Sequence, residues 1–418
     1  MGVYLDHNAT SPSTPAHLAR LMARYQSVVG NPSSPHAAGR SASVALTEAR
    51  KAVAVSLGCE PSEIVFVSGG SEANNVATRG VLRQAERSMS ELHAVTSTVE
   101  HPCVLEPLKH LQRSEGLQLT FLPVDSNGRI RLSDLAESLQ PNTALVSVMA
   151  ANNETGAVQP VREFGDWLNA VRWQKVKATA DWRQSGIETW PDWARKLSVS
   201  VGQRELQNLH FHVDAVQAYG KLQSAQWLSM GFDSVSVCAH KLGGLAGVGA
   251  LMTRRGRKFE PLILGGAQER SRRAGTENLM GILSFGAVAE SISSEDWWQN
   301  VSRTDELRQQ LARFLERFAG VLVNTPPDHA LPNTVNVCVE ASMIKGEDVL
   351  MELDMRGFYA SSGSACSSAA NRPSHVLLAQ GRTPEQASNA IRFSLGQDTT
   401  EQQIQLLCEA LQEIFTRR

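Results

Sequence analysis

Short segments rich in Val, Ile, Leu and Phe alternate with amphipathic helical segments along the first part of the chain. Strands that are apolar at consecutive positions are typical of sheets buried on both faces. Strands that alternate with helices predict βαβ units and a mainly parallel sheet. The predicted strands span residues 3–5, 63–67, 94–98, 118–122, 145–149, 211–213 and 234–237, and the predicted helices span 14–30, 40–57, 72–85 and 162–172.

The last third of the chain has a different order, with strands predicted at 333–339, 358–362 and 391–395 and a helix at 346–353. Thr383 and Thr400 each begin a helix, because Thr at the N-cap with Gln three residues later forms a capping box. We therefore expect an α/β fold with two domains. The large domain spans 13–295, and a smaller α+β domain combines 1–12 with 296–418.

The segment from about 173 to 208 interrupts the strand–helix order. It is polar, yet it carries Trp173, Trp182, Trp190 and Trp193. Four tryptophans argue against plain disorder, and a few residues would suffice to join a helix to the next strand. We expect an ordered surface insertion in the large domain, either a lid or partner surface or an excursion without function.

Composition and charge exclude several classes of protein. Forty basic and 42 acidic residues give a net charge of −2, which favours neither a nucleic-acid nor a membrane surface. The apolar runs are shorter than the ~18 residues of a membrane span, and Met1–Asp6 does not resemble a signal peptide. The six cysteines form no CxxC pair, so we expect no zinc site, no disulfide framework and a cytoplasmic location.

Lys241 follows the strand predicted at 234–237 and precedes two glycines. Burying an ammonium costs several kcal/mol unless it is paired or neutralised. A desolvated lysine with a lowered pKa, however, is a nucleophile that forms Schiff bases with carbonyl compounds. Taken alone, Lys241 is better explained as a surface lysine whose stem covers apolar surface. Its assignment therefore depends on the other strand ends.

Two further strand ends carry candidate binding groups. Gly70 and Ser71 lie in a turn between a strand and a helix, where backbone N–H groups and a hydroxyl suit a phosphate, although a plain turn fits as well. Asp214 ends another strand. Three roles are open for Asp214: a metal ligand together with His212, a carboxylate that faces a cationic nitrogen, or the cap of a helix.

His101 and Asn153 also follow predicted strands. In an open α/β sheet, ligands bind at the carboxyl ends of the strands, so all these side chains are expected at one edge. A phosphate-binding turn, a carboxylate for a ring nitrogen, an imidazole and a Schiff-base lysine together indicate a site for pyridoxal 5'-phosphate.

The smaller unit supplies two more candidates. Cys366 lies in a loop of small residues, Ser361–Ala370, so its thiol is either exposed and reactive or an incidental surface cysteine. Arg392 interrupts an otherwise apolar strand, and a buried arginine usually has a carboxylate partner.

These motifs resemble, in order and over nearly the whole chain, the NifS/IscS-type cysteine desulfurases of the class V aminotransferases, which are fold-type I pyridoxal-phosphate enzymes. The Ser361–Cys366 loop is the most specific part of the resemblance, whereas the His-Lys pair alone is not specific. The other matching segments are 4–10, 30–34, 68–75, 100–101, 152–156, 212–217, 240–241, 273–276 and 392–396.

The resemblance implies a role for each group around the cofactor ring. Lys241 forms the Schiff base and moves protons at the substrate Cα. Asp214 pairs with the ring nitrogen, and His101 stacks on the ring. Asn153 and Gln217 contact the ring oxygen.

It also implies that Gly70, Ser71 and His240 hold the phosphate and that Thr276 reaches it from the neighbouring subunit of a homodimer. Cys238 stands where the family usually has a serine. Because S–H is a weaker donor than O–H, this exchange predicts weaker cofactor binding. His7 replaces a common tyrosine.

For the substrate, the resemblance implies that Arg392 binds the carboxylate of L-cysteine, with help from Asn31 and Asn153. Cys366 then attacks the substrate sulfur, keeps it as a persulfide and releases alanine. Cys366 is also the one expected metal ligand, and only as a transient ligand of an iron–sulfur cluster.

We therefore expect a cytoplasmic, homodimeric cysteine desulfurase that passes sulfur to an acceptor or iron–sulfur scaffold protein and has no nucleic-acid or membrane partner. The alternatives are a selenocysteine lyase or another class V enzyme, which would not need the Cys366 loop, and a scaffold protein that has lost catalysis. Intact Lys241, Asp214 and Cys366 argue against the scaffold.

Overall fold

The computed structural model describes residues 2–28, 30–173, 208–223, 231–363 and 373–416. Within them, the largest sheet has seven strands in the order β2-β8-β7-β6-β5-β3-β4. The strands are β2 (Ile64–Val67), β3 (His93–Ser97), β4 (Gln118–Leu122), β5 (Thr143–Met149), β6 (His210–Asp214), β7 (Ser234–Cys238) and β8 (Gly249–Thr253). Only β8 runs antiparallel to its neighbours, β2 and β7. The predicted mainly parallel α/β sheet is thereby confirmed.

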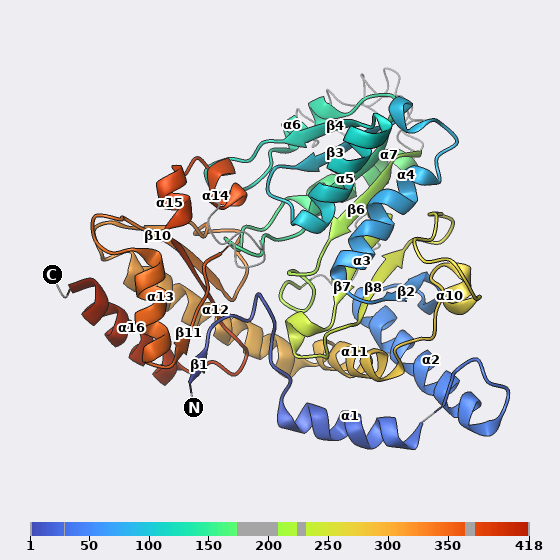
Figure 1. The fold of residues 1–418 in the computed structure, drawn as a ribbon, viewed down its shortest axis with the longest axis horizontal. Coiled ribbons are helices and arrows are strands. Elements are labelled where there is room, and N and C mark those ends of the chain that lie inside the picture. The colour runs from blue at the N-terminus through green and yellow to red at the C-terminus, as the bar shows by residue number, and fades with distance from the viewer. Residues whose placement is uncertain (1, 29, 174–207, 224–230, 364–372, 417–418) are drawn as a thin grey trace.

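Helices cover both faces of this sheet (Figure 1). The helices α2 (Ala37–Leu57), α7 (Val161–Trp173) and α11 (Leu279–Ile292) share one core with the sheet, in which Phe164, Phe211 and Phe285 are buried. The helices α3 (Gly70–Asn75), α4 (Val81–Arg83) and α5 (Pro102–Glu115) pack on the other face. Consecutive strand residues therefore face opposite layers, which explains the uninterrupted apolar strands.

A smaller unit follows α11 and packs beside the large sheet (Figure 1). Its antiparallel sheet has the order β12-β10-β9, formed by β9 (Val321–Val323), β10 (Thr334–Val339) and β12 (Ala390–Ser394). Its helices are α12 (Glu295–Leu315), α13 (Gly346–Met355), α14 (His375–Ala379), α15 (Pro384–Ser388) and α16 (Glu401–Thr416).

The N-terminal strand lies within this smaller unit, where Figure 1 shows it in dark blue among orange and red elements. The strand β1 (Val3–Tyr4) pairs in parallel with β11 (Phe358–Tyr359). Beyond it, Asp6 forms a bridge to Ser394 of β12. The chain then crosses to α1 (Pro15–Ser27), which packs against α11. The exact domain boundaries stay a prediction.

Three details differ from the sequence prediction. The helix expected at 72–85 is interrupted, because Val76–Gly80 forms a π-helical segment between α3 and α4. β11 ends at Tyr359, three residues earlier than expected. The elements that were not predicted are the strands β8 and β9 and the helices α5, α6 (Leu132–Ser138), α10 (Gln268–Ser271), α11, α12 and α14.

Most of the Trp-rich segment at 173–208 lies outside the described residues, so its expected order and role stay untested. In the described part of the chain, no helix is both long and apolar enough to cross a membrane.

Candidate active site

Most predicted site residues line one cavity of about 310 Å³ at the carboxyl ends of β2, β3, β5, β6 and β7. Such an edge is the usual ligand-binding position of open α/β sheets. The predicted residues that line it are Gly70, Ser71, His101, Asn153, Asp214, Gln217, Cys238, His240, Lys241 and Arg392.

Two of the predicted residues that the structure describes, Asn31 and Thr276, do not line this cavity. Asn31 is exposed, and its side-chain oxygen accepts a hydrogen bond from the Ser33 backbone N–H at 2.9 Å. Thr276 is exposed beside a separate cavity of about 150 Å³. Cys366 lies outside the described residues. Within its own chain, the structure therefore does not bring Asn31 or Thr276 to Lys241.

Lys241 lies in the turn His240–Leu242, directly after the fully buried strand β7. Its Nζ donates hydrogen bonds to the backbone oxygens of Asn8 at 2.7 Å and Ala9 at 2.8 Å. The Ser11 hydroxyl donates to the Lys241 carbonyl at 2.9 Å. The N-terminal segment that crosses between the two sheets thus fixes both the backbone and the amine of this lysine.

Asp214 is buried at the end of β6. One carboxylate oxygen accepts from the Val216 backbone N–H at 3.0 Å, and the other accepts from the Asn74 side-chain amide at 2.7 Å. Burial raises the pKa of Asp214, because both partners are neutral and desolvation disfavours the charge.

His212, the suggested metal partner of Asp214, has other contacts. Its Nε2 lies 3.0 Å from the Asn74 side-chain oxygen, and its Nδ1 lies 3.0 Å from the Ser234 hydroxyl. Burial lowers the pKa of His212 to about 3. The described residues contain no group of three or more His, Cys, Asp or Glu side chains that could hold a metal. The His212–Asp214 metal option therefore finds no support in the described part of the chain.

His101 is the N-cap of α5, and its Nδ1 accepts a hydrogen bond from the Cys103 backbone N–H at 3.2 Å. Burial lowers the pKa of His101. A neutral imidazole whose Nδ1 is an acceptor carries its proton on Nε2. The Cys103 thiol lies 2.9 Å from Nδ1, and burial raises the pKa of this thiol to about 12.

Gly70, Ser71, Cys238 and His240, the residues expected to hold the phosphate, also line the cavity. A Cβ at Gly70 would lie 2.6 Å from a methyl group of Val216, so only glycine fits there. Cys238 is buried, and burial raises the pKa of its thiol to about 11. Cys238 is therefore a neutral thiol at physiological pH.

Arg392 lines the cavity from β12 of the smaller unit and is almost completely buried. Its Nη1 donates to the Asn153 backbone oxygen at 3.0 Å. Its Nη2 forms an ion pair with Asp6 at 2.6 Å. Among the described residues, its Nε has no hydrogen-bond partner. The carboxylate partner expected for this arginine is present within the chain.

Comparisons with known proteins agree with this arrangement. The family model "Aminotransferase class-V" matches residues 3–187 and 200–407. The chain belongs to the class V aminotransferase family. The resemblance to its NifS/IscS-type members is also confirmed. "Cysteine desulfurase IscS" from Dictyoglomus turgidum is 36% identical over 99% of this chain and 95% of its own length. "Cysteine desulfurase" from Nostoc sp. is 39% identical over 99% and 93%.

Solved structures of class V relatives have the same fold. A structure titled "NIFS-LIKE PROTEIN" superposes with a TM-score of 0.82 at 31% identity, covering 100% of both chains. Another, titled "SspA in complex with cysteine", gives a TM-score of 0.74 at 29% identity, covering 95% of this chain and 100% of its own. The predicted fold-type I architecture is confirmed.

The class V family depends on pyridoxal phosphate, and the cavity fits this cofactor. Asp214 is buried with two neutral hydrogen-bond donors, and a protonated ring nitrogen would supply the cation that its carboxylate needs. Lys241 provides a primary amine in the same cavity, and Gly70 leaves room where a side chain would clash.

The prediction from sequence missed several residues of this class V site. Asn8 contributes its backbone oxygen to Lys241, and Asn74 binds Asp214. Asn74 could have been found from the sequence, because it lies about one helical turn after Ser71, which was already a candidate residue. Asn8 and Cys103, which also line the cavity, carried no comparable local signal.

Proposed function

We propose that this chain is a cysteine desulfurase that uses pyridoxal 5'-phosphate to convert L-cysteine to L-alanine and holds the sulfur as a persulfide on Cys366. One observation carries the proposal: Lys241 and Arg392, an amine and a carboxylate-binding group, line the same cavity from two different units of the fold. The relatives' names and the neighbour solved with cysteine support the same substrate.

Pyridoxal phosphate held in this cavity would supply an electron sink for the substrate carbons once the substrate amine has taken the place of the Lys241 amine. Lys241 then carries protons at the substrate Cα. Its amine is well placed for this task, because Asn8 and Ala9 hold it with carbonyl oxygens that only accept hydrogen bonds. These acceptors orient Nζ without donating a proton to it.

Asp214 and His101 act on the cofactor ring in this proposal. The Asp214 carboxylate stabilises a protonated ring nitrogen, and Asn74 fixes its orientation. His101 presents an imidazole to the same cavity, with Nδ1 held by the Cys103 backbone. Asn153 and Gln217 line the cavity and are assigned to the ring oxygen. Gly70, Ser71, Cys238 and His240 are assigned to the phosphate.

Arg392 is assigned to the carboxylate of L-cysteine. Its guanidinium is already held by Asp6 and the Asn153 backbone oxygen, while its Nε has no partner among the described residues. A bound carboxylate would satisfy that donor or share the guanidinium with Asp6. Asn31 lies outside this cavity in its own chain, so its assigned contribution would come from the partner subunit.

Cys366 receives the sulfur. Its thiolate attacks the substrate sulfur, the C–S bond breaks, and the electron pair stays with the carbon, which is protonated to give alanine. The described start of the loop supports this role, because Ser361 pairs with Arg392 through N···O distances of 2.7 and 3.2 Å.

A homodimer is part of the proposal, because Thr276 is exposed and lines a cavity other than that of Lys241, so its assigned phosphate contact would be made in a partner subunit. A sulfur-acceptor or iron–sulfur scaffold protein would receive the persulfide, and a transient cluster on Cys366 belongs to the same step. The proposed location is the cytoplasm. A selenocysteine lyase is less favoured, because the full-length relatives are named cysteine desulfurases.

One assay tests the function. Purified protein is expected to be yellow and to release sulfide and alanine in equal amounts from cysteine and a reductant. Cys366→Ala should abolish sulfide release and keep the colour, whereas Lys241→Ala should lose the Schiff-base absorbance. Undiminished sulfide release by Cys366→Ala would contradict the persulfide step. A colourless protein that still binds an acceptor would favour the scaffold alternative.

A further inference from the structure

Lys221 is a buried lysine that the proposed mechanism does not use. It follows β6 by seven residues and is 8% exposed. Its Nζ donates to the side-chain oxygens of Asn8 and Gln217, both at 2.9 Å. In the described residues no carboxylate forms an ion pair with it, so a buried amine here is held by two neutral amides. Burying an amine without a counter-ion lowers the free energy of unfolding, so we expect its contacts to have a role at the candidate active site.

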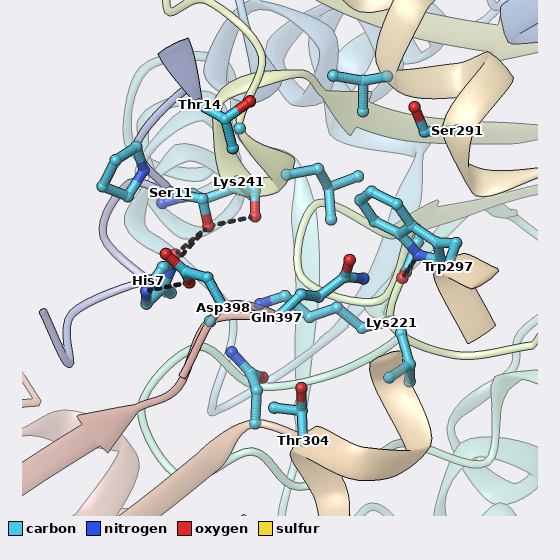
Figure 2. A pocket seen from close by; sticks show the side chains of 18 of the residues that line it. His7, Ser11, Thr14, Lys221, Lys241, Ser291, Trp297, Thr304, Gln397 and Asp398 are labelled. Carbon is cyan, nitrogen blue, oxygen red and sulfur yellow. Dashed lines mark hydrogen bonds and ion pairs between the residues drawn. The ribbon is translucent and has the colours of Figure 1, made fainter. Parts of the chain in front are cut away.

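Lys221 also lines a second cavity, of about 270 Å³, whose lining side chains Figure 2 shows. Lys241 lines both cavities. In the second cavity, the Ser11 hydroxyl links the His7 imidazole, at 3.1 Å, to the Lys241 carbonyl, at 2.9 Å. Lys221 is not among the residues that line the candidate active site, and its described hydrogen bonds reach that cavity through Asn8 and Gln217.

Lys221 helps to orient two side-chain amides, although that of Asn8 is also held by hydrogen bonds with Asn333, Asn153 and Thr334. A lysine amine has N–H donors for both bonds whether it is charged or neutral, so Asn8 and Gln217 turn their oxygens toward it. The Gln217 NH₂ group must then point away from Lys221. It donates to the Asn8 backbone oxygen at 2.9 Å, the same oxygen that accepts from Lys241 at 2.7 Å.

We propose that Lys221 is a positioning residue for the reaction at Lys241: it holds the side-chain oxygen of Gln217 and thereby turns the Gln217 NH₂ group toward the Asn8 backbone oxygen and the cofactor cavity that both residues line. The inference rests on the proposed roles of Lys241 and Gln217. A donor held toward the ring oxygen and a nearby positive charge both disfavour a proton on the Lys241 nitrogen.

Several charged groups surround this pair of lysines. Burial, with Lys241 and Arg392 nearby, lowers the pKa of Lys221 to about 7, so its charge varies near neutral pH. The titratable groups facing one or both lysines are His7, His101, Asp214, Cys238, His240 and Arg392. Any measured pH profile must therefore compare variants that change Lys221 alone.

The test is a pH titration of the visible absorbance of the yellow protein. In Lys221→Met, both donors and the charge are lost, so we expect the acid dissociation constant of the chromophore to fall about tenfold or more. We also expect kcat for cysteine to fall at least about tenfold while KM changes little, since Lys221 does not contact the substrate site. Lys51→Met, at an exposed lysine of α2, is the matched control and should leave both unchanged.

Asn8→Asp provides a second variant if Lys221→Met fails to fold. Its carboxylate keeps an oxygen acceptor for Lys221 and neutralises the charge, so the chromophore pKa should again rise. An unchanged chromophore pKa in the folded variants would overturn the positioning role. A purely structural role would lower stability without moving this pKa. If Lys241→Ala kept the wild-type absorbance, the proposed function itself would be wrong, which is a separate outcome.

Discussion

Asp6 and Arg392 form an ion pair, with 2.6 Å between Oδ1 and Nη2, that joins the N-terminal segment to β12. The Arg392 side chain is 2% exposed and that of Asp6 is 21% exposed. An arginine assigned to the substrate carboxylate is therefore already paired with a carboxylate of its own chain. Substrate binding and the anchoring of the N-terminal segment depend on the same guanidinium.

Asp6→Asn separates these two tasks. The substitution removes the competing charge, so we expect the KM for cysteine to fall. It also leaves a buried guanidinium without its counter-ion, so the free energy of unfolding should fall by about 1–3 kcal/mol. Steady-state kinetics and urea denaturation measure the two effects. A higher KM would show that Asp6 orients Arg392 for the substrate rather than competing with it.

A second buried ion pair, Arg50 with Glu269, fixes an unusual turn. Glu269 accepts two hydrogen bonds from the guanidinium and one from the Phe66 backbone N–H. The turn holds Glu269, Arg270 and Ser271 at φ values of 47°, 59° and 61°, a conformation that costs energy in residues other than glycine. The pair thus stabilises the segment that leads to Thr276.

Glu269→Gln should lower the free energy of unfolding by about 3–5 kcal/mol, because it leaves Arg50 buried without its counter-ion. Glu115→Gln is the matched control, since its pair with Arg83 is about one-third exposed and should contribute under about 1 kcal/mol. Urea denaturation of both variants gives the comparison. Equal losses would show that the Arg50–Glu269 pair does not hold the turn.

The sequence predicted most of the central sheet, because its strands are continuous apolar segments bounded by turns. It did not predict β8, because Gly249–Thr253 begins with Gly and Ala, which are depleted in strands, and has no Val, Ile or aromatic residue. Only pairing with β2 and β7 makes this segment a strand. The π-helical segment within the helix expected at 72–85 was also missed, since it depends on packing rather than on propensity.

The sequence predicted those site residues that combine a reactive side chain with a position at the end of a predicted strand, such as Asp214 and Lys241. Asn8 and Lys221 could not be identified in this way. Their hydrogen bond joins residues 213 positions apart, and the Asn8 oxygen that holds Lys241 is a backbone atom. Such contacts exist only after the N-terminal segment has crossed between the two sheets.

The buried carboxyl group of Glu154 makes the free energy of unfolding depend on pH. It is buried, and its Oε2 accepts from the hydroxyl of Ser374 at 2.5 Å. Burial raises the pKa of Glu154 from 4.5 to about 7. The folded protein therefore binds this proton more tightly than the unfolded chain does, and the free energy of unfolding falls as pH rises from about 4.5 to about 7.

Glu154→Gln removes this ionisation and keeps the side chain's shape. The variant should gain thermal stability relative to the wild type as pH rises from 5 to 8, with most of the gain reached by about pH 7. Glu48→Gln, at an exposed glutamate, controls for the change in net charge. A stability difference that is constant across this pH range would mean that Glu154 is ionised throughout.

Cys238 provides the last prediction, because it lines the cofactor cavity where the family usually has a serine. The thiol is buried and neutral, with a pKa raised to about 11, so it can offer a phosphate only a weak S–H donor. Cys238→Ser should therefore bind pyridoxal phosphate more tightly, by about three- to tenfold. Cys408→Ser, in α16, should leave the affinity unchanged. Equilibrium titration of the cofactor-free protein measures both values, and weaker binding by Cys238→Ser would mean that the thiol contributes by packing rather than as a donor.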